Sequence, residues 1–311
     1  MSDVTPFKGN MVLCALMMVP GAAIAQDISG AATLGYGFSS ISNGGGDLNQ
    51  FTLDGAGDID FLNGLALGLT GGLVHADADR GGDISLTDLG ADLAYTSVGG
   101  ATFGGYLDYT DFGGNGLLTG STDTSSYGLM GGYAGDLLQL TANLGWSDAS
   151  GAAVAGVSDW MDYGLNVSYT PSDQTRIAGH WQLGDLDNAL GGDDLSSIGI
   201  GASHVFGAGI IGFGGISRTE FDAANLEATS YGIGVGYDLS QISNLPAQMS
   251  LELARTNVER AARPDADVDT IRLGVTIPLG ARASAAPLNS LANGIMSPRR
   301  NALSTLYGSS F

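Results

Sequence analysis

The chain has 311 residues, of which 51 are glycine and only one is cysteine, and its formal net charge is −21. This length suits one large all-β domain or two ordinary domains, and a single cysteine excludes a disulfide framework. The strong negative charge argues against nucleic acid as a partner, and it is compatible with a surface or a lumen that attracts cations.

The N-terminus has the pattern of an export signal. Residues 11–19 are apolar throughout, and Ala23-Ile24-Ala25 has the small-residue spacing of a cleavage site. We predict that residues 1–25 are a signal peptide and that Gln26 begins the mature chain. The alternative is a short buried apolar segment. Cys14 lies inside the predicted signal, and residues 1–25 hold one acid and one base, so cleavage leaves the net charge unchanged.

From residue 26 to residue 280 the chain alternates apolar residues with small or polar ones, most clearly in residues 271–279. A period of two residues predicts β-strands. The apolar parity is ambiguous only in residues 209–220. Strands are predicted at residues 28–40, 51–61, 65–75, 86–96, 101–111, 125–134, 137–147, 159–170, 175–184, 196–206, 209–220, 229–239, 248–257 and 268–279.

One face of nearly every predicted strand is apolar, and the other consists of Gly, Ser, Thr, Asn and Asp. A soluble sandwich buries its apolar faces against each other, whereas a transmembrane barrel turns them toward lipid. Short turns alternate with longer polar connections, and aromatic residues gather at both strand ends, as in outer-membrane barrels. We predict an all-β fold: a transmembrane antiparallel up-and-down β-barrel of about fourteen strands, with sixteen as the alternative. A soluble all-β fold is the competing interpretation.

The C-terminal residues 281–311 leave this pattern. They contain Pro287, Pro298 and the pair Arg299-Arg300, and they end on Phe311. We predict a flexible periplasmic tail. Because phenylalanine is the usual last residue of outer-membrane barrels, a terminal strand is the alternative.

Strand parity assigns charged side chains to the lumen. The acids are Asp54, Asp58, Asp60, Asp88, Asp92, Asp108, Asp162, Asp238 and Glu252, and the bases are Arg176, Arg272 and Arg218. This excess of carboxylates predicts a preference for cations, although the same groups could be ordinary solvated side chains. Hairpin registers predict Asp88 opposite Asp108, with Asp54 at a similar height. They also place Glu252 beside Arg272 as a cross-strand pair.

Catalytic and metal-binding signals are weak. His180 is predicted to face the lumen in mid-strand, and the sequence has neither H-E-x-x-H nor G-x-S-x-G. Residues 77–83 half-match a calcium loop, but glycine stands at its fifth position and Asp88 at its twelfth. We therefore predict no catalytic residue, no metal and no cofactor. Residues 112–124 are predicted to be the third exterior loop, which either narrows the pore or lies on the surface.

Together, these features resemble Gram-negative porins, most closely those of alphaproteobacteria. The resemblance covers roughly residues 26–280 as a pattern, and the strand Leu273-Gly274-Val275-Thr276-Ile277-Pro278-Leu279-Gly280 carries much of it. It implies sixteen strands, a homotrimer, a place among outer-membrane lipids and passive diffusion of small hydrophilic solutes. We expect such a pore, biased to cations and without enzyme activity. The alternatives are a non-conducting surface barrel with a plugged lumen, a barrel enzyme using His180, and a transporter of an apolar substrate.

Overall fold

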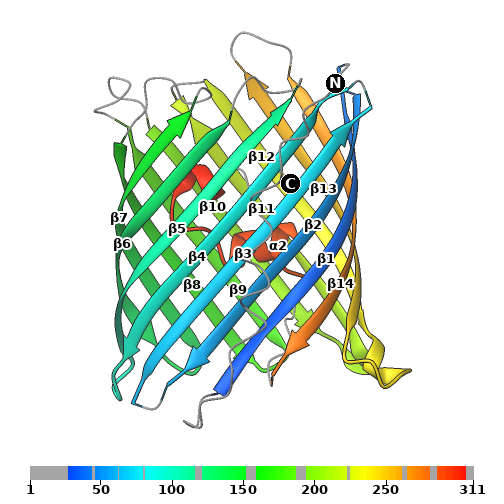
Figure 1. Cartoon of the computed structure of the whole chain (residues 1–311). Coiled ribbons are helices and arrows are strands. Elements are labelled where there is room, and N and C mark those ends of the chain that lie inside the picture. The colour runs from blue at the N-terminus through cyan, green and yellow to red at the C-terminus, as the bar shows by residue number, and fades with distance from the viewer. Residues whose placement is uncertain are drawn as a thin grey trace, which may run out of the picture.

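Fourteen antiparallel strands form a closed barrel in which β1 pairs with both β2 and β14 (Figure 1). The computed structural model describes residues 27–43, 46–61, 63–79, 81–115, 121–151, 159–186, 194–222, 225–260, 265–280 and 286–305. The strands are β1 Asp27–Ile41, β2 Gly46–Asp60, β3 Leu65–Ala78, β4 Asp83–Thr96, β5 Ala101–Asn115, β6 Thr122–Ala134, β7 Leu138–Gly151, β8 Asp159–Ser172, β9 Thr175–Asp185, β10 Asp194–Val205, β11 Ile210–Phe221, β12 Leu226–Asp238, β13 Gln248–Arg260 and β14 Ala266–Leu279. The predicted fold class is confirmed, with fourteen strands and not sixteen.

The two faces of the wall have the polarity predicted from the sequence. On β1, Leu34 and Tyr36 are 48% and 52% exposed, whereas Thr33 and Ser39 are 0% and 3% exposed. Apolar side chains therefore point outward and small polar side chains point inward. This is the inverse of a water-soluble protein and the arrangement of a membrane barrel.

Exposed aromatic side chains lie near both ends of the strands. Tyr95 stacks on Phe103 next to the turn at residues 97–100, and their ring centroids are 6.1 Å apart. Tyr127 stacks on Trp146 at the same centroid distance, closer to the opposite end. We call the barrel end with the 97–100 connection the turn end and the other the loop end. None of the helices in the described residues is long and apolar enough to cross a membrane.

The strands extend further toward the loop end than predicted. The loop predicted at residues 112–124 loses its first part to β5, which continues through Asn115, and β6 begins at Thr122. The middle of this loop and the predicted signal peptide lie outside the described residues, so a narrowing third loop remains a prediction.

The C-terminal residues 286–305, which we call the luminal segment, lie inside the barrel (Figure 1, orange to red). Helix α2 (Leu291–Met296) packs against β9, β10, β11 and β12, with Leu291, Ala292, Ile295 and Met296 buried. For these residues, the predicted periplasmic tail and the alternative terminal strand are both wrong. The reason is that the inner wall offers the segment apolar contacts and charged partners across the lumen.

The luminal segment also explains the ambiguous parity of residues 209–220. Ile211 and Phe213 point inward and are 5% and 4% exposed, whereas Ile216 points outward and is 49% exposed. The two inward side chains belong to a buried apolar cluster with Ala286 and Met296. Strand β11 is therefore apolar on both faces because its inner face packs against protein.

Candidate functional site

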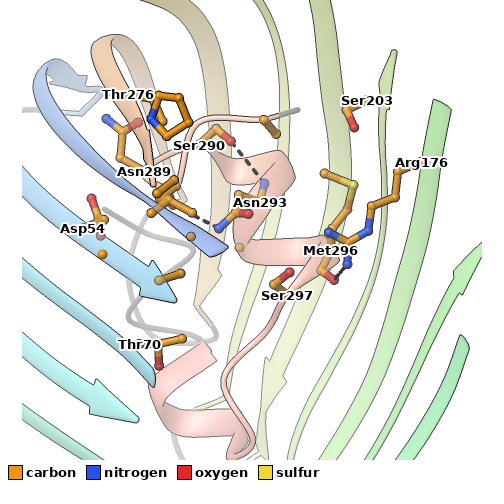
Figure 2. Close-up of a pocket in the computed structure, with 18 of the residues that line it drawn as sticks. Asp54, Thr70, Arg176, Ser203, Thr276, Asn289, Ser290, Asn293, Met296 and Ser297 are labelled. Atoms are coloured by element: carbon orange, nitrogen blue, oxygen red, sulfur yellow. Dashed lines mark hydrogen bonds between the residues drawn. The ribbon is translucent and has the colours of Figure 1, made fainter. Parts of the chain in front are cut away.

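A cavity of about 1330 Å³ lies between the luminal segment and the barrel wall (Figure 2). Asp54, Asp58 and Asp60 of β2 line it, and Asn289 and Asn293 face it from the luminal segment. The lining includes Asp136, Asp173, Ser240 and Pro246 near the short connections, so the cavity reaches the turn end. A cavity with both polar and apolar lining therefore lies beside the luminal segment and extends to the turn end.

Two adjacent arginines of the luminal segment bind carboxylates of β4 and β5. Arg299 forms an ion pair with Asp88, and its Nη1 donates to Thr70 Oγ1 at 2.8 Å. Arg300 forms an ion pair with Asp92, and its Nη1 lies 3.2 Å from Asp108 Oδ1. Whole-residue exposure is only 8% for Asp88 and 5% for Asp108. Buried carboxylates need such partners, and the arginines supply them.

The side chain of Arg300 also lies over an aromatic ring. Its guanidinium carbon is 5.2 Å from the ring centroid of Tyr106, which is 3% exposed. This distance is within the range of a cation–π interaction. Arg300 therefore contacts two carboxylates and one ring.

The main chain of the arginine pair is held by two further strands of the wall. Gln182 of β9 donates its side-chain N–H to the carbonyl of Arg299, and Asn143 of β7 donates to the carbonyl of Arg300 at 3.2 Å. Side chains from β4, β5, β7 and β9 therefore hold this dipeptide.

Glycines in the wall leave room for the carboxylates. A Cβ atom added at Gly72 would lie 2.4 Å from Asp88 Oδ2 and 3.1 Å from Asp54 Oδ1. One added at Gly90 would lie 2.6 Å from Asp108 Oδ1. These close approaches explain why the inner wall has glycine beside its acids.

The predicted pair of Glu252 and Arg272 is confirmed. The two residues are opposite in register, and Arg272 Nη1 lies 3.0 Å from Glu252 Oε2, with side chains 6% and 3% exposed. Glu252 Oε1 also accepts the main-chain N–H of Leu291 at 3.0 Å. This contact at the start of α2 was not predicted.

His180 faces the lumen as predicted. Its Nδ1 is 2.9 Å from the carbonyl oxygen of Ile295 in α2, and its Nε2 is 3.2 Å from Ser197 Oγ. In the register it stands opposite Asn166, whereas Asp162 stands opposite Gly184. Asp162 instead accepts hydrogen bonds from Ser147 and from Trp160 Nε1.

Most predicted lumen residues point inward. Asp54, Asp58, Asp88 and Arg176 line the cavity. The remaining inward residues, buried or paired with inward groups, are Asp92, Asp108, Asp162, His180, Glu252 and Arg272.

Arg218 is the exception, and its assignment to the lumen is wrong. Its side chain is 51% exposed and forms ion pairs with Glu220 at 2.6 Å and Glu227 at 2.8 Å. Ser217 and Thr219 on either side of it are buried and point inward.

The predicted register around the acidic sector is partly wrong. Asp88 stands opposite Thr110, and Asp108 stands opposite Gly90, so the two acids are not directly paired. Asp54 and Asp88 both flank Gly72, which confirms their similar height. Asp88, the twelfth position of the half-matched calcium loop, is turned into the lumen toward Arg299.

Arg299 and Arg300 were the functional candidates missed in the sequence. They form the only adjacent pair of basic residues in the chain. The excess of inward carboxylates on the early strands was a signal that an unassigned cation should join them. Without a register for the luminal segment, however, the sequence does not indicate which arginines do so.

No family model matches the chain, and no curated protein matches it. Among solved structures, a FadL homologue from Pseudomonas aeruginosa has a TM-score of 0.53 and 10% identity, covering 81% of this chain and 90% of that chain. An anion-selective porin from Comamonas acidovorans has a TM-score of 0.49 and 13% identity, with 82% and 99% covered. The Pseudomonas putida toluene transporter TodX has a TM-score of 0.47 and 11% identity, with 88% and 94% covered. The first likeness supports the fold alone, a closed β-barrel.

Proposed function

We propose that this protein is an outer-membrane channel through which small hydrophilic solutes and ions diffuse passively, with a preference for cations. The luminal segment restricts the pore. The observation that carries the proposal is the cavity of about 1330 Å³ beside that segment, whose lining includes Asp54, Asp58 and Asp60. A channel of this kind acts as a sieve and an electrostatic filter, and it needs no chemistry.

The distribution of charge supports the cation preference. Asp54, Asp58 and Asp60 lie on the same face of β2 and span about 20 Å of the wall. Arg272 and Arg299 each pair with one carboxylate, and Arg300 pairs with two. Among the described residues, seven aspartates but only two arginines line the cavity, and this excess of carboxylates attracts cations to it.

The placement in the outer membrane rests on the lipid-type outer face, the two aromatic bands and the predicted signal peptide of residues 1–25. The special likeness to alphaproteobacterial porins and the homotrimer remain predictions.

The test is single-channel recording of refolded residues 26–311 in a planar bilayer under a KCl gradient. We expect small discrete steps with a reversal potential on the cation side. The variant Asp54→Asn with Asp58→Asn should lower the cation preference. Its matched control is Asp111→Asn with Asp123→Asn, a directly opposed pair outside the cavity lining. An equal shift in the control, or no shift in either variant, would contradict the proposed filter.

A second candidate function is a closed surface or structural barrel. The observation that favours it is that the luminal segment reaches both sides of the lumen, with α2 on β9 to β12 and Arg299-Arg300 on β4 and β5. Such a barrel would be silent in the bilayer while still showing the heat-modifiable gel shift of a folded barrel. The contacts of His180 with Ile295 and Ser197 support a packing role over a catalytic one.

A further inference from the structure

We propose that Asp88, Asp92, Asp108 and Tyr106 form a binding site for short peptides that carry guanidinium groups, and that Arg299-Arg300 occupies this site as an internal competitor. The inference goes beyond the proposed function, because the site binds such a peptide whether or not the barrel conducts.

The chemistry of the site favours guanidinium over ammonium. Its three carboxylates lie on the neighbouring strands β4 and β5, and Asp92 stands directly opposite Tyr106 in the register. A planar guanidinium can stack on the ring and direct its N–H groups to carboxylates at its edge, as Arg300 does here. A compact ammonium group presents no flat face and no fixed fork of donors.

The site also recognises a peptide main chain. Gln182 and Asn143 donate to two successive carbonyl groups, those of Arg299 and Arg300. A free guanidinium or a diamine has no such carbonyl groups. The arrangement therefore fits an arginine-containing dipeptide better than an isolated cation.

Arg300 does not bind Asp108 with both branches of its guanidinium. The guanidinium of Arg300 reaches Asp108 Oδ1 through Nη1 at 3.2 Å, and no guanidinium nitrogen is paired with Oδ2 among the described residues. The side chain of Asp108 is only 2% exposed. Carboxylates bind guanidinium best through two parallel hydrogen bonds, so an unconstrained ligand can improve on Arg300 here.

The cavity gives a ligand a route to Asp88, the member of the site that lines it. Asp88 and Arg299 both line it, and it extends to the turn end of the barrel. A peptide entering at that end meets Asp60, Asp58 and Asp54 before it reaches Asp88. Such an acidic approach attracts a cationic peptide and raises its local concentration.

The experiment compares the parent chain with Arg299→Ala/Arg300→Ala by calorimetric titration in detergent, with arginyl-arginine amide as the probe. Because a tethered competitor acts at an effective concentration of about 1 mM, the variant should bind the dipeptide more tightly than the parent. Adding Asp92→Asn and Asp108→Asn to the variant should weaken binding by about 30-fold or more. The control variant is Arg218→Ala, which removes an arginine outside the lumen and should bind like the parent.

A citrulline dipeptide of the same shape tests the charge requirement. Failure of the folded double-alanine variant to bind arginyl-arginine, or equal binding of the citrulline dipeptide, would overturn the site. A heat-modifiable gel shift verifies that each variant is folded. Because binding is measured without current, a silent barrel that still binds the dipeptide would contradict the proposed channel and leave this site standing.

A second measurement uses the unmodified chain. Leu303 of the luminal segment belongs to the same buried cluster as Trp160, so displacement of the segment should change the tryptophan fluorescence. We expect a change that saturates with arginyl-arginine and is absent with the citrulline dipeptide. If the fluorescence stays constant while the double-alanine variant binds, Arg299-Arg300 is not a competitor and that part of the proposal fails.

Discussion

Glu252 and Arg272 face each other across β13 and β14, and the same glutamate accepts the first N–H of α2. One buried carboxylate thus joins the wall of the barrel to the segment that fills it. Because both side chains of the pair are almost fully buried, loss of either partner leaves an uncompensated charge.

We therefore expect Arg272→Ala to destabilise the barrel by about 3–5 kcal/mol. The measurement is unfolding in urea, followed by the heat-modifiable gel shift. The control is Arg255→Ala, which breaks an exposed ion pair with Asp269 on the same two strands and should change stability little. Similar losses in both variants would show that burial of the first pair is not the cause.

Arg299→Ala with Arg300→Ala should enlarge the conducting pathway. The substitution removes the ion pairs to Asp88, Asp92 and Asp108, so the luminal segment loses its hold on β4 and β5. We expect larger or longer single-channel openings than in the parent chain. Arg218→Ala serves as the comparison, because that arginine pairs only with exterior acids in the described structure. Unchanged conductance in the double variant would mean that the segment does not restrict the pore.

Gly72→Ala should disturb the contact between Arg299 and Asp88. The new Cβ atom would lie 2.4 Å from Asp88 Oδ2, so the carboxylate must move. Overpacking of this kind costs about 1–3 kcal/mol. Gly55→Ala is the matched control, because Gly55 stands opposite Gly71 on β3 and a Cβ there has no neighbour within 4 Å. Urea unfolding of the two variants should differ, and equal midpoints would contradict the steric argument.

We expect His180→Ala to weaken the packing of α2 against the wall. We do not expect it to remove an enzymatic activity. The substitution removes the contact to the carbonyl of Ile295, and an unsatisfied buried polar group costs about 1–3 kcal/mol. The expected results are a lower unfolding midpoint and a shift in tryptophan fluorescence. If the parent chain hydrolysed lipid or peptide substrates and His180→Ala abolished that activity, the histidine would be catalytic and this interpretation would fail.

The strands and their two faces could be predicted from the two-residue alternation alone. That alternation does not depend on which residues are paired across neighbouring strands. The hairpin between β4 and β5 shows why. The sequence predicted Asp88 opposite Asp108, whereas the structure pairs Asp88 with Thr110, two residues further along. A slip of two residues keeps every side chain on its face and changes only its partner. The acids were therefore assigned correctly to the lumen, but their neighbours were not.

The luminal segment could not be predicted because neither periodicity nor a hairpin constrains it. Its contacts join residues far apart in the chain, as when Arg299 binds Thr70 or Leu288 donates to Thr33.

The wrong assignment of Arg218 to the lumen also follows from the unpredicted position of this segment. The inner face of β11 carries apolar residues that pack against this segment. Because β11 is apolar on both faces, its sequence did not show that Arg218 is on the outer face.

The luminal segment also has a mechanical consequence. It touches β1 through Leu288, the β9 to β12 wall through α2, and β6 through Asn301, whose Nδ2 donates to Ser126. In the described barrel wall, other strands separate β1, β6 and the β9 to β12 group from one another. By linking these separated strands across the lumen, the segment braces the glycine-rich wall. Its withdrawal would let the cross-section of the barrel flatten under lateral pressure from the bilayer.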